Sequence, residues 1–470
     1  MRRAAILILA LAFAGCGGPA GDHAPSPTAG AAGSIELLLV GVDGLDWTVA
    51  LRLLREERMP HLRSLIDRGV AGRIATIAPA KSPVIWTSII TGKEPAEHGI
   101  LDFITDAQGG KQRLFTSADR RTKALWNILD DAGRRSIVVS WWNSFPAEPI
   151  EGVVVAQANT LEQISLRRML KPGGLLEDVP DQVHPATRQQ QMLEIAREVD
   201  RAMPALLEKN FGDIGRATKL ADRANLDSCA WSVRADESTR RIALRLAAEP
   251  EGAELLAVYF GTPDVVSHRF WRFHEPGAFD HPPDAAAIAQ FGDVVVDAYA
   301  AFDGMLGDLL AAVGDGTNVV VVSDHGMHAH NTGSRFDRPV NGRLERESGG
   351  HEDGPPGMLV AAGPAFRHEA LPGPIDELHE VDLPSLGHVL DITPTLLALF
   401  ELPVGGDMRG WVLEELLTDP PPVVRVDTHD TAAWLASRPD AAPFVPGTEE
   451  RLEQLRSLGY IGSDTNEEKP

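Results

Sequence analysis

Ser82 stands in a stretch whose residue types suit a nucleophile at the start of a helix. Pro83 follows it directly, and proline is favoured in the first helical turn, where its missing N–H costs nothing. Gly92 then predicts the end of the helix. A hydroxyl at a helix N-terminus lies beside unpaired backbone N–H groups and the positive end of the helix dipole, which suits an alkoxide and a bound phosphate. Serine is also a common helix cap, so this position alone favours a plain cap.

Carboxylates and histidines follow three apolar runs elsewhere in the chain. They are Asp43, the pair Asp264 and His268, and the pair Asp324 and His325. Asp264 and His268 are four residues apart, so both can reach one ion from a helix or a turn. Each piece also has a structural interpretation, namely a turn aspartate before Gly44 or a hydrogen-bonded Asp–His pair. It is their number that favours a shared site.

Three further histidines lie after the last of these pairs. His351 follows two glycines and precedes another apolar run, so it is a candidate ligand in a glycine-rich loop. His328 and His330 could add ligands, but exposed loop histidines are the favoured interpretation for these two. We therefore carry only His351 into the candidate site.

The elements that position these residues are buried strands. Near-continuous apolar runs at 35–42, 254–260 and 318–322 are typical of parallel strands covered on both faces. Strands are also expected at 70–77, 136–141 and 357–362, and helices at 47–57, 82–92, 123–132, 285–313 and 391–400. This alternation predicts an α/β fold with a mainly parallel sheet and helices on both faces. In such sheets the carboxyl ends of the strands form the site, so Ser82 and the Asp and His residues can converge there.

The ligand types predict the metals. Mixed carboxylate and imidazole ligands suit zinc, with manganese as the alternative, better than magnesium or a thiolate site. The candidate residues suffice for two ions. Two ions a few ångströms apart can clamp the attacking and leaving oxygens of a phosphoryl transfer.

The ordered set of motifs resembles the alkaline phosphatase superfamily, specifically its type I phosphodiesterase/nucleotide pyrophosphatase branch. The matching pieces span most of residues 35–365 and are Val-Asp43-Gly, Lys81-Ser82-Pro83, Thr91-Gly92-x-x-Pro95-x-x-His98-Gly99-Ile100, Pro263-Asp264-x-x-x-His268, Ser323-Asp324-His325-Gly326-Met327 and Gly350-His351. The ending Leu455-Arg456-Ser457-Leu458-Gly459-Tyr460 is also similar to tails in this superfamily.

The resemblance implies an alkaline-phosphatase-like fold and assigns roles to the candidate residues. One metal would be held by Asp264, His268 and His351. The other would be held by Asp43, Asp324, His325 and the oxygen of Ser82. Ser82 would attack phosphorus to form a phosphoseryl intermediate, which water then hydrolyses.

Two departures from the branch affect the expected substrate. A serine stands where its nucleotide pyrophosphatases usually have threonine, and Leu101-Asp102-Phe103 stand where a phosphate-binding asparagine is expected. The apolar residues 83–86 after Ser82 suit a phosphodiester better than a monoester. The alternatives are a phosphomonoesterase or phosphotransferase on the same scaffold, or a non-catalytic envelope-binding lipoprotein. A sulfatase is disfavoured because Trp86 occupies the place of the required arginine.

The negative net charge of the 470-residue chain limits the kinds of molecule that it is expected to bind. The formal net charge is −23, which argues against nucleic acid as a partner and favours a small phosphate ester substrate held through metal ions.

The first residues predict export and a lipid anchor. Residues 1–15 read as a signal peptide, with Arg2 and Arg3 before a short apolar run, and small residues precede Cys16 as in a lipoprotein cleavage box. We expect a lipid-anchored protein on the periplasmic or extracellular side of a bacterial cell envelope, with ordinary secretion as the alternative. The remaining cysteine, Cys229, is expected to be buried and inert.

The rest of the chain divides into three parts. Residues 16–33 are a flexible Gly-, Ala- and Pro-rich tether, and residues 34–420 form the catalytic domain. Within it, the charged, Leu- and Ala-rich stretch at about 160–250 predicts a helical insertion. Residues 421–470 form a tail that contains a short helix at 449–458.

Overall fold

A nine-stranded sheet forms the centre of the computed structural model, in the order β13-β2-β12-β9-β1-β8-β5-β6-β7. The structure describes residues 34–106, 112–156, 180–212, 220–337 and 347–438. The strands pair in parallel except β12, which is antiparallel to both neighbours, and β7, which is antiparallel to β6. The predicted mainly parallel α/β fold is confirmed.

The strands of the large sheet include all six that the sequence predicts. They are β1 (Ile35–Val42), β2 (Gly69–Ala75), β5 (Ser136–Val139), β6 (Gly152–Val155), β7 (Val183–His184), β8 (Ala253–Phe260), β9 (Asn318–Val322), β12 (Gly357–Ala362) and β13 (Ser385–His388). Two-stranded sheets pair β3 (Ile104–Asp106) with β4 (Gln112–Leu114), β10 (His328–Ala329) with β11 (Gly349–Gly350), and β14 (Val404–Gly405) with β15 (Arg425–Val426).

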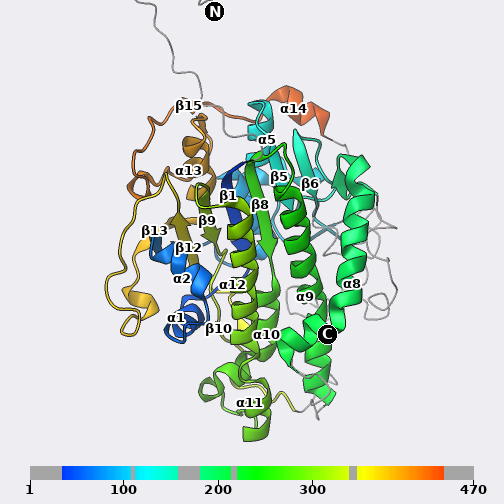
Figure 1. Ribbon diagram of the computed structural model, residues 1–470, viewed down its shortest axis with the longest axis vertical. Helices are drawn as coiled ribbons and strands as arrows, with labels where there is room; N and C mark the ends of the chain where they lie inside the picture. Colours follow the sequence, from blue (N-terminus) through cyan, green and yellow to red (C-terminus); the bar gives the residue numbers. More distant parts are fainter. Residues whose placement is uncertain (1–33, 107–111, 157–179, 213–219, 338–346, 439–470) are drawn as a thin grey trace, which may run out of the picture.

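Two hydrophobic cores form on opposite faces of this sheet because strand side chains alternate. In β1, Leu38, Val40 and Val42 pack into one core, whereas Leu37 and Leu39 pack into the other. The first core joins the sheet to α1 (Trp47–Arg55), α2 (Pro60–Ile66), α8 (Gln189–Phe211), α9 (Leu220–Ala247), α10 (Thr262–His274), α11 (Ala285–Phe291) and α12 (Val294–Val313). The second core joins it to α3 (Ser82–Thr91), α5 (Leu125–Asp131) and α13 (Ile392–Leu399). Figure 1 shows α8, α9, α10 and α12 side by side in front of the sheet.

The prediction of one continuous helix at 285–313 is wrong. The stretch 285–313 forms two helices, α11 and α12, that are separated at Gly292 and Asp293. Gly292 caps α11 with a helical φ of −62°, and a Cβ atom there would lie 2.7 Å from the carbonyl oxygen of Ile288, so this close approach favours glycine.

The described part of the charged stretch at about 160–250 contains the short strand β7 and is otherwise mainly helical, in α8 and α9. Helices α8 and α9 pack against each other, and α9 also packs on β8, β5, α10 and α12. They therefore form part of the helical layer over the first core. Cys229 lies in α9 and is buried with a free thiol, as expected.

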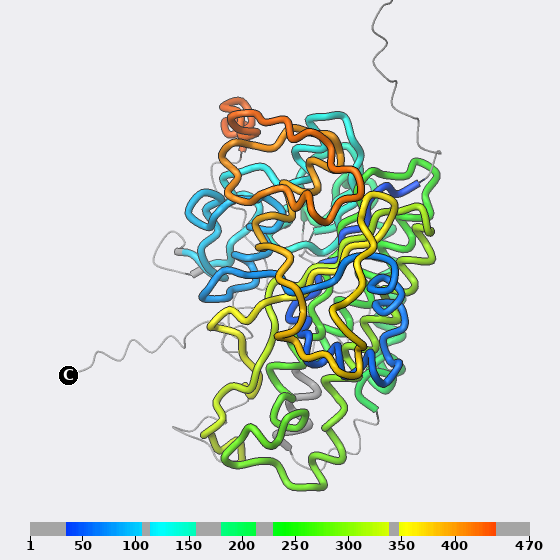
Figure 2. The backbone as a smooth tube through the Cα atoms, turned by 90° about the vertical axis from the view of Figure 1, so that its left-hand side faces the viewer, coloured from blue at the N-terminus to red at the C-terminus, as the bar shows by residue number. Residues whose placement is uncertain are grey.

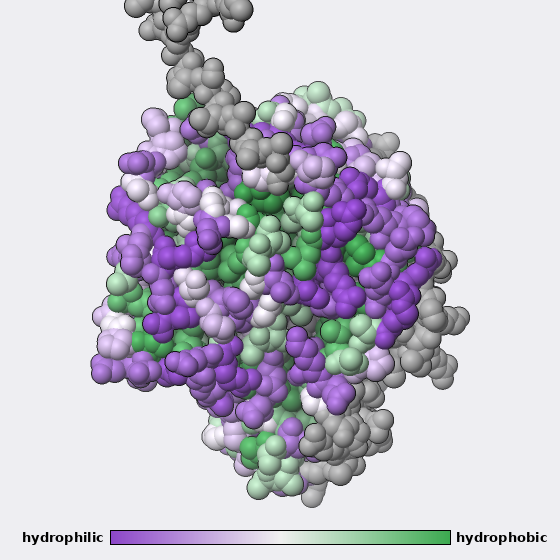
Figure 3. Space-filling model, viewed as in Figure 1, coloured by the Kyte–Doolittle hydropathy of each residue, from purple (hydrophilic) through white to green (hydrophobic). Residues whose placement is uncertain are grey.

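The last segment that the structure describes, residues 425–438, lies in the upper part of the molecule in Figure 1. Arg438, after the short helix α14 (Ala432–Ser437), contacts Glu148 at 2.6 Å, and Figure 2 shows the orange segment beside the cyan one there. The predicted helix at 449–458 lies outside the described residues, as do the signal peptide, the tether and Cys16. Among the described helices, none is long and apolar enough to cross a bilayer. Hydrophilic side chains predominate on the face of Figure 3, in keeping with the high charge.

Candidate active site

The candidate residues converge because their strands end at one edge of the sheet. β1 pairs in parallel with β8 on one side and β9 on the other, so Asp43, Asp264 and Asp324 emerge close together. β2 also runs in this direction and leads towards Ser82. His351 precedes a strand, but β12 runs antiparallel to its neighbours, so its first residues lie at this same edge.

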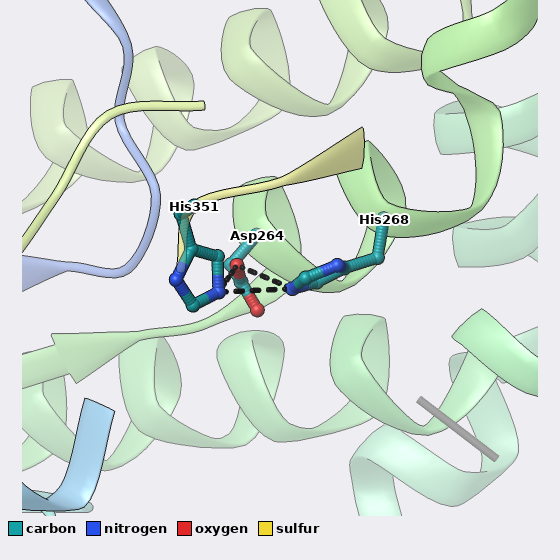
Figure 4. Close-up of side chains that lie close together, drawn as sticks. All are labelled: Asp264, His268 and His351. Carbon is teal, nitrogen blue, oxygen red and sulfur yellow. Dashed lines mark hydrogen bonds and ion pairs between the residues drawn. The ribbon is translucent and has the colours of Figure 1, made fainter. Parts of the chain in front are cut away.

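The first cluster consists of Asp264, His268 and His351. His268 Nε2 lies 3.2 Å from Asp264 Oδ1 and 3.1 Å from His351 Nε2, and His351 Nε2 lies 3.7 Å from Asp264 Oδ1. Asp264 and His268 come from α10, one turn apart, and His351 comes from the end of β11 (Figure 4). All three side chains are buried. They can therefore offer three ligand atoms to one ion.

Contacts outside this cluster orient His268. Its Nδ1 atom lies 2.8 Å from the carbonyl oxygen of Gly349 and 3.2 Å from Oε1 of Glu347. A hydrogen bond from Nδ1–H leaves Nε2 facing Asp264 and His351, which is the arrangement that a ligating histidine needs.

Asp236 of α9 fixes the start of α10. Its carboxylate oxygens accept hydrogen bonds of 2.9 Å from the backbone N–H groups of Gly261 and Thr262. Burial raises the pKa of Asp236 to about 6. The helical insertion thus supports the helix that carries Asp264 and His268.

The second cluster contains Asp43 and His325, and it also contains Asp264. His325 Nε2 lies 3.3 Å from Asp43 Oδ1 and 3.2 Å from Asp324 Oδ2. The Ser82 hydroxyl lies 3.4 Å from Asp43 Oδ1. The four residues proposed for the second metal are therefore adjacent, and Asp264 stands between the two clusters.

Ser82 begins α3, as the sequence predicts. The helix runs from Ser82 to Thr91, has Pro83 in its first turn, and ends at Gly92 with φ +66°. The preceding residue makes no side-chain cap in this helix. The Ser82 hydroxyl therefore sits where backbone N–H groups and the helix dipole favour negative charge.

Burial and the close approach of these charged groups shift their pKa values. Burial disfavours a charged His325, but the carboxylates of Asp324 and Asp43 outweigh it and raise its pKa to about 9. Burial and the charge of Asp43 raise the pKa of Asp324 well above its usual value. Burial and the neighbouring histidines lower the pKa of His351.

The donor set fits divalent cations. Within the described residues, Asp324 Oδ2 and His325 Nε2 are buried and have no hydrogen-bond partner besides the ion-pair contacts that they make with each other and that His325 makes with Asp43. Buried polar atoms of this kind carry a desolvation cost unless a partner satisfies them. Imidazole and carboxylate donors that converge in this way suit a divalent metal ion.

Several residues at the site were not predicted from the sequence. Tyr259 and Trp86 both donate hydrogen bonds to Asp43, at 2.5 Å and 3.0 Å. Each stands in an apolar stretch that is typical of the hydrophobic core, so nothing in the sequence indicates that its polar atom contacts Asp43. Lys81, which directly precedes Ser82, forms an ion pair with Asp102.

His328 lies in β10 and His330 directly follows it, and both form ion pairs with residues outside the two clusters. His328 pairs with Asp353 at 2.7 Å, and His330 pairs with Glu352 at 3.5 Å. Neither belongs to the metal-ligand groups found among the described residues. Both histidines are half-buried, and His328 belongs to β10 rather than to a loop.

Comparisons with known proteins agree with this site. The family model "Type I phosphodiesterase / nucleotide pyrophosphatase" matches residues 37–372. No curated protein matches the chain.

Solved structures of low sequence identity cover much of the chain. Murine and human ectonucleotide pyrophosphatase/phosphodiesterase 5 each cover 82% of this chain and 100% of their own, with identities of 14% and 13% and TM-scores of 0.45 and 0.44. Phosphonoacetate hydrolase from Sinorhizobium meliloti, in complex with phosphonoformate, has 18% identity, covers 63% of this chain and 57% of its own, and has a TM-score of 0.37. Since the family model spans most of the chain and contains all of the motifs from Asp43 to His351, the chain belongs to the type I phosphodiesterase/nucleotide pyrophosphatase family of the alkaline phosphatase superfamily and is an enzyme that hydrolyses phosphoric ester bonds.

Proposed function

We propose that the chain is a two-metal phosphodiesterase with Ser82 as its nucleophile. The observation that carries the proposal is the placement of the Ser82 hydroxyl, 3.4 Å from Asp43 Oδ1, at the N-terminus of α3 and beside two clusters of metal-ligand type. A plain capping serine has no need of two such clusters beside it.

The residues divide into two ligand sets. Asp264, His268 and His351 would hold one ion, and Asp43, Asp324, His325 and the Ser82 oxygen would hold the other. The two ions, zinc or manganese, would supply the positive charge that an acidic chain otherwise lacks for a phosphate ester. Asp264 lies within reach of both sets, so it would bring the two ligand sets close enough to serve one phosphate group.

Ser82 would perform the covalent step. A new bond forms between Ser82 Oγ and phosphorus, and the bond between phosphorus and the leaving ester oxygen breaks. Water then hydrolyses the phosphoseryl intermediate and restores the serine. The α3 N-terminus stabilises negative charge on the transferring group throughout.

A substrate panel with metal-loaded protein tests this proposal. The Ser82→Ala variant should lose several orders of magnitude in kcat on an aryl phosphodiester and still bind metal, because the covalent route is gone. Ser88→Ala is the matched control, since Ser88 lies on the same helix but bonds to His98 at 2.9 Å. Near-normal activity of Ser82→Ala would reduce Ser82 to a helix cap.

The location of the enzyme is a separate proposal that rests on residues 1–33. The charged start, the apolar run and Cys16 support a lipid anchor on the outer side of a bacterial membrane. The full-length protein should partition into detergent, and Cys16→Ser should abolish this. A soluble mature protein that begins elsewhere would refute the anchor.

A further inference from the structure

The two carboxylate oxygens of Asp43 have separate sets of partners. Oδ2 accepts hydrogen bonds from the Tyr259 hydroxyl at 2.5 Å and from Trp86 Nε1 at 3.0 Å. Oδ1 faces His325 Nε2 at 3.3 Å and the Ser82 hydroxyl at 3.4 Å. One oxygen is thus bound by the protein, and the other points into the candidate metal site.

Burial and packing against two tryptophans fix the position of the Tyr259 side chain. It is the penultimate residue of β8, its side chain is buried, and its ring packs edge-on against Trp86 with ring centroids 5.3 Å apart. A second tryptophan, Trp142, lies 6.2 Å from it in the same manner. These contacts leave the Tyr259 hydroxyl directed at Asp43, to which it donates its hydrogen bond.

Trp86 is equally constrained. It lies one helical turn after Ser82 on α3, and its indole packs against Gly41 of β1. A Cβ atom on Gly41 would lie 2.7 Å from the Trp86 ring, so this approach requires glycine. Trp141 packs edge-on against Trp86 at 5.2 Å and bonds to its backbone oxygen rather than to Asp43.

These contacts limit how Asp43 can bind an ion. A carboxylate oxygen has two lone pairs, and both lone pairs of Oδ2 are used by Tyr259 and Trp86. Two-oxygen chelation would require breaking one of these hydrogen bonds in a buried site, which is costly. The cation of the second cluster is therefore left with Oδ1 alone.

We propose that Tyr259 and Trp86 are positioning residues that hold Asp43 so that only Oδ1 is available to the divalent cation shared with His325 and Ser82. The inference rests on the proposed two-metal function. Because Trp86 lies on the helix that begins at Ser82, the same contact fixes the nucleophile relative to this metal ligand. Partners of this kind around a ligating carboxylate typically change metal affinity by about 10–100-fold.

Metal titration of single variants tests the inference. Tyr259→Phe and Trp86→Phe remove one donor each and keep a ring in the cluster. Trp141→Phe is the matched control, because it alters the same aromatic cluster without removing a partner of Asp43. Metal-free full-length proteins are titrated with zinc against a chromogenic chelator, and their folding is checked by circular dichroism.

We expect one of the two zinc affinities to fall about 10–100-fold in Tyr259→Phe and in Trp86→Phe, and to change little in Trp141→Phe. A structure of zinc-loaded Tyr259→Phe should show Asp43 turned so that both oxygens approach the ion. Should either variant fail to fold, the other still decides the question. Unchanged affinities in the folded variants, or an equal loss in Trp141→Phe, would overturn the inference. If the wild-type protein bound no zinc at all, it is the proposed function that would fail.

Discussion

The imidazole rings of His325 and His351 are stacked, with ring centroids 3.6 Å apart and planes inclined by 14°. The two residues belong to different ligand clusters, so their contact joins the clusters directly. Asp264 joins them a second time, because its carboxylate lies within reach of both histidine sets. The two candidate metal sites are therefore adjacent, and they share Asp264 and the contact between His325 and His351.

The first prediction concerns Asp264, which the two candidate metal sites share. Asp264→Asn should reduce both metal affinities, because Asp264 offers an oxygen to each cluster, whereas His268→Ala should weaken only one. Metal content per chain, measured by mass spectrometry after dialysis, distinguishes the two variants. We expect close to no bound metal in the first variant and about one ion in the second. Full retention of one ion by Asp264→Asn would show that the clusters are independent.

The second prediction concerns Gly44, which follows Asp43. Its φ of +64° is in the left-handed region, and a Cβ atom there would lie 2.9 Å from Asp264 Cβ and 3.0 Å from Asp264 Cα. Gly44→Ala should therefore displace Asp264, weaken metal binding, and lower stability by about 1–3 kcal/mol. Thermal unfolding and metal titration measure both effects.

Gly133→Ala is the control for Gly44. Gly133 has a similar φ of +69°, but nothing lies within 4 Å of its Cβ position. It should show the cost of the backbone conformation without the loss of metal. Equal metal binding in the two variants would mean that contact with Asp264 is unimportant.

The sequence predicts the sheet well because its central strands are buried on both faces. The bounds of β1, β9 and β12 coincide with the predicted runs, since a strand covered on both sides needs apolar residues at nearly every position. The same runs predicted where the carboxyl groups emerge. Short strands such as β7 and β13 were missed because their pairing depends on neighbours far away in the chain.

The candidate site was predicted less completely. The grouping of its residues follows from strand direction and from the family motifs, but the position of Asp264 between both clusters depends on the turn at Gly44. Tyr259 and Trp86 could not be assigned to Asp43, because an aromatic residue in an apolar run gives no sign of which side chain its polar atom meets. The break at Gly292 was missed because the flanking residues continue a helical pattern.

The third prediction concerns pH and the metal-free protein. The pKa of His325 is raised from 6.5 to about 9, so the folded state holds a proton that the unfolded chain releases near pH 6.5. Its contribution to stability is fully present below pH 6.5 and is lost as pH rises through about 9. The melting temperature of chelator-treated protein should therefore fall over this window.

Two comparisons test the origin of this pH effect. His325→Asn should reduce the dependence, because one of the groups whose pKa is raised is absent. His268 should supply part of the remainder, since the carboxylates of Asp264 and Glu347 outweigh its burial and raise its pKa well above its usual value. Saturating zinc should also reduce it, since a bound metal replaces the proton. A melting temperature that does not change between pH 6.5 and 9 in the metal-free wild type would contradict the assignment.

The last prediction concerns the substrate. The Lys81 ammonium, next to the nucleophile in sequence, is paired with the carboxylate of Asp102, and apolar residues 83–86 follow Ser82. A phosphomonoester dianion gains more from an unpaired cation near phosphorus than a diester does. We therefore expect a higher kcat/KM for an aryl phosphodiester than for the matching monoester. Asp102→Asn, which removes the charge paired with Lys81, should shift this ratio towards the monoester, whereas Asp67→Asn, which removes a charge from an exposed pair with Arg63, should leave it unchanged. A wild-type preference for the monoester would instead favour a phosphatase on the same scaffold.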